Sequence, residues 1–125
     1  MSPTPALDAF TRAYIECALW SSMDNSNEQG GGPLDLNYDI TDIAPETLAC
    51  MAADCADFQA SNAEHLADYP DENAGHDFWL TRNGHGCGFW ENDFSTPEHC
   101  EALTAAAKAR GSCDLYVGDD GKIYL

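Results

Sequence analysis

The chain has 125 residues, of which 22 are acidic and 5 are basic, so its formal net charge at pH 7 is −17. Repulsion between like charges excludes nucleic acid and anionic membrane surfaces as direct partners. The length is typical of one domain with a single hydrophobic core, spanning residues 1–125. The hydrophobic content of 44% is ordinary for a folded protein and argues against disorder.

The acidic composition has three interpretations. It can serve solubility alone, or it can be an adaptation to high salt, because Asp outnumbers Glu by 14 to 8 and the chain has two lysines. It can also serve to bind a basic partner, such as a protein surface that normally holds DNA or RNA. The composition does not choose among the three.

Six cysteines are present, but the first ten residues lack the charged and apolar regions of a signal peptide. No window approaches the ~18 apolar residues of a membrane-spanning helix. We therefore expect a cytoplasmic protein with reduced cysteines rather than a disulfide-bonded or membrane protein.

The first element is a predicted helix over residues 5–22, with Thr4 as its N-cap and Pro5 in its first turn. Residues 24–33 contain three consecutive glycines and no hydrophobic residue, which predicts a flexible loop. Residues 34–40 alternate apolar and polar side chains, which is typical of a short edge strand or an extended approach to the next helix.

A second helix is predicted from residue 41 or 42 to residue 69, where Pro70 stops it. The helical period separates its two faces. The apolar face carries Leu48, Met51, Cys55, Phe58, Asn62, Leu66 and Tyr69. The acidic face carries Glu46, Asp54, Asp57, Glu64 and Asp68, and Asp71 and Glu72 extend it. No lysine or arginine lies between Arg12 and Arg82, so we expect no local neutralisation of this face.

Residues 75–90 predict a β-hairpin around Asn83-Gly84, the preferred pair for a type I′ turn. In that register His76 faces Glu91, and Cys87 lies on the same face. Arg82, Asn83 and His85 would form a polar tip, which is either a plain turn or a contact point for a partner.

A third helix is predicted from the Ser95–Glu98 capping-box spacing to Gly111. A second hairpin follows, with strands at 114–117 and 122–125 around the Gly118–Gly121 turn. The predicted fold is therefore α+β in the order α-α-β-β-α-β-β, with helices packed on a small antiparallel sheet.

Three segments resemble a family of small, uncharacterised bacteriophage and prophage proteins: GHDFWLTRNGHGCGFW at 75–90, Leu103-Thr104-x-Ala106-Ala107 in the third predicted helix, and LYVGDDGKIY at 115–124. The resemblance implies a phage accessory protein in the host cytosol. Proteins of that kind often inhibit host defence, as anti-CRISPR and anti-restriction proteins do, or modify host machinery. The family has no known activity, so the resemblance assigns no catalytic residue.

Metal and catalytic sites have weak support in the sequence. The histidines and cysteines do not have zinc-ligand spacing, and the Gly118–Gly121 loop is not a calcium loop, so we expect no metal and no cofactor. One alternative is a small enzyme or metal protein centred on His76, Cys87 and Glu91, but a buried thiol and a cross-strand polar pair explain these residues better. A second alternative is an acidic structural protein with no inhibitory role.

The leading hypothesis is a protein that binds a basic, nucleic-acid-binding host protein as a nucleic-acid mimic. Carboxylates that rise along one rigid helix at ~1.5 Å per residue would be spaced like backbone phosphates. The residues expected to act as phosphate surrogates are Asp54, Asp57, Glu64, Asp68, Asp71 and Glu72.

Overall fold

The computed structural model describes residues 8–22, 38–84, 88–89, 95–113 and 115–125. Over these ranges the chain forms mostly helices and one small antiparallel sheet, so the α+β class is confirmed in broad terms. The elements are α1 (Ala9–Ser21), the 3₁₀ helix η2 (Ile40–Asp42), α2 (Pro45–Ser61), α3 (Ala63–Leu66), α4 (Asp71–Arg82), α5 (Pro97–Ala109), β1 (Tyr116–Val117) and β2 (Ile123–Tyr124).

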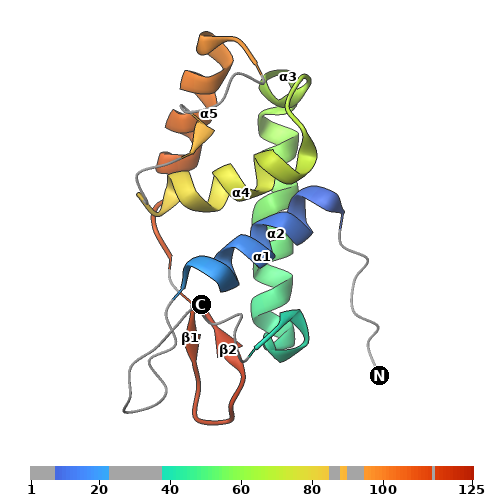
Figure 1. Cartoon of the computed structure of the whole chain (residues 1–125), viewed down its shortest axis with the longest axis vertical. Coiled ribbons are helices and arrows are strands. Elements are labelled where there is room, and N and C mark those ends of the chain that lie inside the picture. The colour runs from blue at the N-terminus through green and yellow to red at the C-terminus, as the bar shows by residue number, and fades with distance from the viewer. Residues whose placement is uncertain (1–7, 23–37, 85–87, 90–94, 114) are drawn as a thin grey trace.

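The helices pack on one another rather than on a sheet (Figure 1). Helix α2 runs along the long axis of the molecule, and α1 and α4 lie side by side across it. Helices α3 and α5 adjoin at one end, and the β1–β2 hairpin lies at the other. The hairpin joins the helical part near the start of α2, where the Ala44 amide donates to the Ile123 carbonyl at 3.0 Å. The predicted layer of helices on a sheet is therefore wrong.

Aromatic rings from three helices form the centre of the core. Phe58 of α2 and Phe78 of α4 stack with ring centroids 4.0 Å apart and planes 14° apart. Phe10 of α1 packs against both rings at 6.2 and 6.0 Å, and Tyr14 lies 5.1 Å from Phe78. The seven residues predicted for the apolar face of the helix over 41–69 are all buried except Leu66, which is half-buried, but only Leu48, Met51, Cys55 and Phe58 lie on α2.

Helix α1 begins at Ala9, and its N-cap is Asp8. The predicted cap Thr4 and first-turn Pro5 lie outside the described residues. The Asp8 carboxylate accepts hydrogen bonds from the Thr11 amide at 2.8 Å and the Gln59 side chain at 3.1 Å. Burial opposes ionisation, but these hydrogen bonds outweigh it and hold the pKa of Asp8 below its ordinary value.

Replacing Asp8 with alanine is expected to lower the free energy of unfolding by about 1 kcal/mol at pH 7, the usual cost of losing an N-cap. Because the folded pKa lies below the unfolded one, this stabilisation is present above the unfolded pKa and is lost as pH falls through the folded pKa. Urea titrations of wild type and variant, followed by circular dichroism, measure the difference. A deficit of the same size at pH 2.5 would contradict the carboxylate's role.

The predicted helix over residues 41–69 is interrupted. Helix α2 ends at Ser61, and Asn62 leaves the helical conformation at φ −124° and ψ 22°. The Asn62 side chain donates to the Phe58 carbonyl at 2.9 Å, while its own carbonyl accepts from the His65 and Leu66 amides. Asparagine thus ends one helix and begins the short α3, so the carboxylates on the two sides of it do not share one rigid helix.

The predicted hairpin over residues 75–90 is also wrong, because residues 71–82 form α4. The buried positions Ala74, Phe78 and Thr81 recur at helical spacing. Asn83-Gly84 ends this helix: the Asn83 side chain donates to the Trp79 carbonyl at 3.0 Å, and Gly84 has a φ of +67°. A type I′ turn requires positive φ at both residues, whereas Asn83 has a φ of −99°.

The predicted third helix and the C-terminal hairpin are confirmed, whereas of the predicted strand or extended segment at 34–40 only 38–40 is described, and Ile40 begins η2. Helix α5 starts at Pro97, although the side chain that caps it belongs to Thr96 rather than Ser95, and accepts from the His99 amide at 3.3 Å. The C-terminal hairpin pairs Tyr116 with Tyr124 and turns at 118–121. Residues 24–33, predicted as a flexible loop, lie outside the described residues.

Candidate functional site

The six carboxylates of the predicted interface come from three parts of the fold. Asp54 and Asp57 lie on α2, and their side chains are 41% and 65% exposed. Glu64 lies on α3 with its side chain 81% exposed. The exposed Asp68 follows α3, and Asp71 and Glu72 occupy the first turn of α4. All six are therefore accessible to solvent, but they have different local environments.

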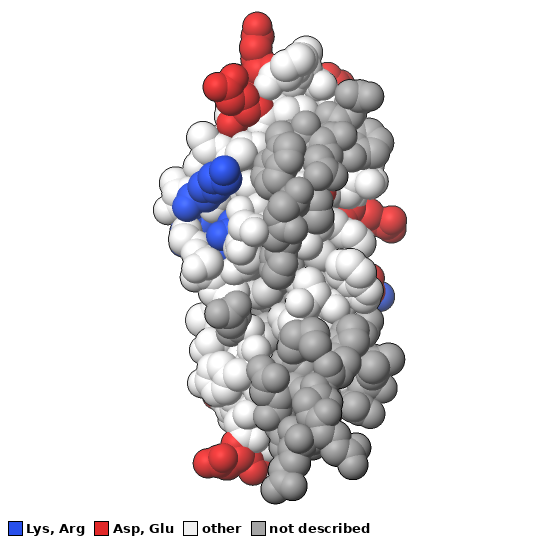
Figure 2. Space-filling view, turned by 60° about the vertical axis from the view of Figure 1, so that its left-hand side comes forward, with Lys and Arg blue, Asp and Glu red and all other residues white. Residues whose placement is uncertain are grey.

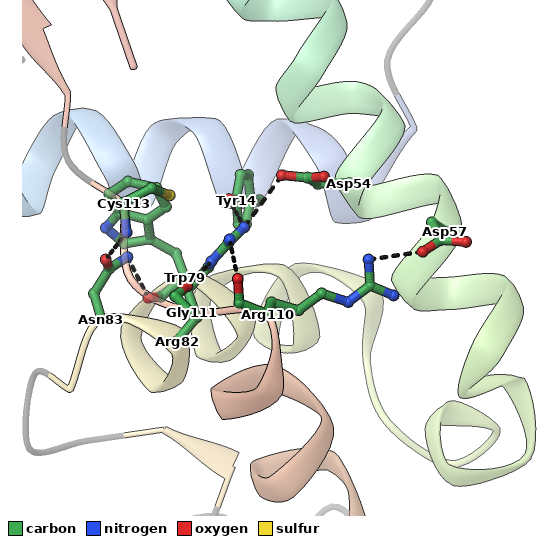
Figure 3. A network of polar contacts seen from close by, with 9 residues as sticks. All are labelled: Tyr14, Asp54, Asp57, Trp79, Arg82, Asn83, Arg110, Gly111 and Cys113. Atoms are coloured by element: carbon green, nitrogen blue, oxygen red, sulfur yellow. Dashed lines mark hydrogen bonds and ion pairs between the residues drawn. The ribbon is translucent and has the colours of Figure 1, made fainter.

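Two arginines neutralise the part of this acidic face that lies on α2 (Figure 3). Arg82 Nη1 lies 3.3 Å from Asp54 Oδ2, and Arg110 Nη1 lies 2.7 Å from Asp57 Oδ2. The guanidinium groups also lie over core rings, Arg82 over Phe78 at 5.5 Å and Arg110 over Phe58 at 5.9 Å. The expectation of an acidic face without local neutralisation is therefore wrong for Asp54 and Asp57.

Arg82 connects three segments of the fold (Figure 3). Besides the Asp54 pair, its Nη1 donates to the Tyr14 hydroxyl on α1 at 3.0 Å. Its Nε and Nη2 donate to the carbonyls of Gly111 and Arg110 at 2.9 and 3.2 Å. These carbonyls follow the last residues of α5, where a helix leaves acceptors unsatisfied. Arg82 thus caps α5 and holds it to α1 and α2.

The hairpin tip predicted at Arg82, Asn83 and His85 is not formed by the first two residues, because Arg82 is the last residue of α4 and Asn83 is its C-cap. The Arg82 side chain is only 7% exposed. The Asn83 side chain accepts from the Cys113 amide at 2.8 Å, so it also fixes the segment after α5. His85 lies outside the described residues. Arg82 and Asn83 therefore hold the fold together.

Burial lowers the reactivity of two groups that could act as nucleophiles, Cys55 and Tyr14. Burial raises the pKa of the Cys55 thiol far above its ordinary value, so this thiol stays protonated. Burial likewise raises the pKa of Tyr14, although the nearby Arg82 opposes the shift. Cys55 is an inert core residue, as the sequence predicts.

The alternative site at His76, Cys87 and Glu91 loses the hairpin on which it depended. His76 is an exposed residue of α4, and Cys87 and Glu91 lie outside the described residues. His76 instead lines a groove of about 490 Å³ between α1 and α4, with Arg12, Glu16 and Glu72. Sequence reasoning did not predict this groove, because it depends on the packing of two helices about 60 residues apart.

Four of the predicted carboxylates have no lysine or arginine ion pair within the described part of the chain: Glu64, Asp68, Asp71 and Glu72. We call these four residues the acidic turn, because they span α3, the following turn and the start of α4. On the face in Figure 2, acidic side chains appear as separate groups at the two ends and one edge of the molecule. The acidity is therefore local rather than a continuous band over the described part of that face.

A histidine pair also joins α3 to α5. The Nδ1 atoms of His65 and His99 lie 2.8 Å apart, and the ring centroids are 5.0 Å apart. His65 Nε2 lies 3.4 Å from Glu64 Oε1. The two histidines are 34 residues apart in the chain, so spacing rules for metal ligands could not find them. Among the described residues, no group of three or more His, Cys, Asp or Glu side chains could hold a metal ion.

Comparisons with protein-family models, with curated proteins and with solved structures give no match to this chain. None of the described helices combines the length and the apolar character needed to cross a membrane.

Proposed function

We propose that this protein binds a basic, nucleic-acid-binding host protein through the acidic turn. The observation that carries the proposal is the distribution of the ion pairs. Arg82 and Arg110 turn inward onto Asp54 and Asp57, and the four carboxylates of the acidic turn lie exposed without such a cation among the residues that the structure describes. In a phage accessory protein this binding would inhibit a host defence complex, as anti-CRISPR and anti-restriction proteins do.

The proposed interface is smaller than the one expected from the sequence. Asp54 and Asp57 would have to give up their arginines to bind a partner, and Arg82 would then remain as a largely buried cation without its carboxylate. The acidic turn has no such cost. Because the helix breaks at Asn62, the proposal rests on exposed negative charge and not on phosphate-like spacing along one helix.

A basic groove that engages this turn would exchange its bound counterions, or its nucleic acid, for protein carboxylates. Binding is therefore expected to weaken steeply as salt concentration rises. Nucleic acid that occupies the same groove should compete. Asp71 and Glu72 also favour α4 through its dipole, but that local effect contributes only about 0.3–1 kcal/mol and creates no affinity for a partner.

The test compares two variants with the same change in net charge. One carries Glu64→Gln, Asp68→Asn, Asp71→Asn and Glu72→Gln. The control carries Glu46→Gln, Glu98→Gln, Glu101→Gln and Asp119→Asn, which are also exposed and include two first-turn residues. Partners are captured from a bacterial host extract, identified by mass spectrometry, and purified for titration between 50 and 200 mM NaCl.

We expect the acidic-turn variant to bind at least about tenfold more weakly with a shallower salt dependence, and the control to stay within about threefold. Added DNA or RNA should displace the wild-type protein. Equal weakening of both variants would mean that net charge alone drives the association. Unchanged binding of the acidic-turn variant would remove the interface.

A further inference from the structure

We propose that His65 and His99 form a binding site for a divalent transition-metal ion of the Cu(II) or Ni(II) class. The site would join α3 to the first turn of α5. The two histidines are not part of the proposed partner interface, and the site shares with the acidic turn only Glu64, which lies beside His65.

The contact between the rings requires a particular distribution of protons. At 2.8 Å, the two Nδ1 atoms leave room for one hydrogen at most, because two N–H groups pointing at each other would repel. Either one ring donates to the other, or both nitrogens present lone pairs to a shared cation. A metal ion bound to both nitrogens would lie to one side of the line that joins them, because the midpoint of that line is only about 1.4 Å from each nitrogen and a metal–nitrogen bond is about 2.0 Å long.

Glu64 favours the metal-binding form of His65. Its Oε1 lies 3.4 Å from His65 Nε2, and a carboxylate at that distance favours the tautomer with its proton on Nε2. The Nδ1 atom of His65 then carries a free lone pair facing His99. Metal-binding histidines commonly have a carboxylate at the second ring nitrogen, where it orients the ring and raises its basicity. Glu64 is a positioning residue in this arrangement, not a ligand.

The distance between the nitrogens indicates the class of ion. With metal–nitrogen bonds of about 2.0 Å, two nitrogens 2.8 Å apart subtend an angle of roughly 90° at the metal. That angle matches neighbouring positions of a square-planar or octahedral ion such as Cu(II) or Ni(II). A tetrahedral zinc ion would need a separation of about 3.3 Å. The geometry therefore favours Cu(II) or Ni(II) over Zn(II).

Two imidazole ligands define a site of moderate affinity. No third His, Cys, Asp or Glu converges on it within the described ranges, so water would complete the coordination. Both rings are half-buried, which limits their motion and reduces the ordering needed to bind an ion.

Nickel chloride is the appropriate probe, because Cu(II) oxidises thiols and Cys50 is exposed. Isothermal titration of the full chain should give one Ni(II) site per molecule. We expect at least a tenfold loss of affinity in His65→Ala and in His99→Ala. His76→Ala is the matched control, since it removes an exposed histidine from α4, and its affinity should equal that of wild type.

A second measurement does not depend on any variant. Long-range ¹H–¹⁵N spectra of the wild-type imidazoles should show Ni(II) perturbing the Nδ1 signals of His65 and His99 first. Absence of Ni(II) binding, binding that persists in either single variant, or first perturbation of His76 would each overturn the site. The circular dichroism spectrum of each variant should keep the helical signal of wild type, which shows that a loss of affinity does not come from unfolding.

Discussion

Replacing Arg82 with methionine should lower the free energy of unfolding by about 2–4 kcal/mol. The guanidinium donates to the Arg110 and Gly111 carbonyls and to the Tyr14 hydroxyl, and it pairs with Asp54. Methionine fills similar space but leaves these acceptors without their donor. The estimate is about 1 kcal/mol below the range for fully buried ion pairs, because Asp54 is 41% exposed and water can solvate it.

Urea denaturation followed by circular dichroism measures this loss, and Arg12→Met is the matched control. Arg12 is an exposed residue of α1, so its replacement should change stability by no more than about 0.5 kcal/mol. Arg82→Lys keeps the positive charge but loses the planar guanidinium and its several N–H donors. Its free energy of unfolding should lie between those of wild type and Arg82→Met. Equal stability of the two methionine variants would mean that Arg82 is not a structural connection.

The elements that the sequence predicts correctly are those with local signals. Pro97 and Gly111 mark the limits of α5, and the glycines at 118 and 121 mark the last turn. The apolar face of α2 follows from the helical period alone. Each of these signals acts within a few residues, so no knowledge of the tertiary structure is needed to interpret it.

Helix α4 shows where local signals become ambiguous. Asn-Gly fits both a hairpin turn and a helix end, because glycine adopts positive φ readily in either setting. Two nearby features favoured a helix: Pro70 immediately before it, and the spacing of Ala74, Phe78 and Thr81. Aromatic residues on both sides of the segment hid this period, since Phe78 and Trp79 are both buried.

The candidate sites depend on contacts that no local pattern contains. The helical period correctly places Asp54 and Asp57 away from the core, but their arginines come from α4 and from the end of α5. The His65–His99 pair likewise needs α3 and α5 to adjoin. Charge on one helix can thus be predicted from sequence, whereas the neutralisation of that charge requires the fold.

The packing of α1 against α4 depends on Gly75, and Gly75→Ala should lower the free energy of unfolding by roughly 3 kcal/mol. A β-carbon at this position would lie 2.2 Å from the Phe10 carbonyl oxygen and 3.0 Å from the Tyr14 amide nitrogen. These two groups are hydrogen-bonding partners along an α-helix, so the clash involves backbone that cannot rotate away. The two helices would have to separate, and the aromatic core between them would loosen.

Whether Gly75→Ala lowers or raises the free energy of unfolding distinguishes close packing of the two helices from the ordinary helix propensity of the two residues. Glycine inside a helix is about 1 kcal/mol less favourable than alanine, so an open site would be stabilised by the same substitution. Asn73→Ala is the control in the same helix: Asn73 is exposed, and its replacement should stabilise α4 by a few tenths of a kcal/mol. Urea titrations of both variants measure the two effects. A Gly75→Ala protein at least as stable as wild type would mean that α1 and α4 do not approach this closely in solution.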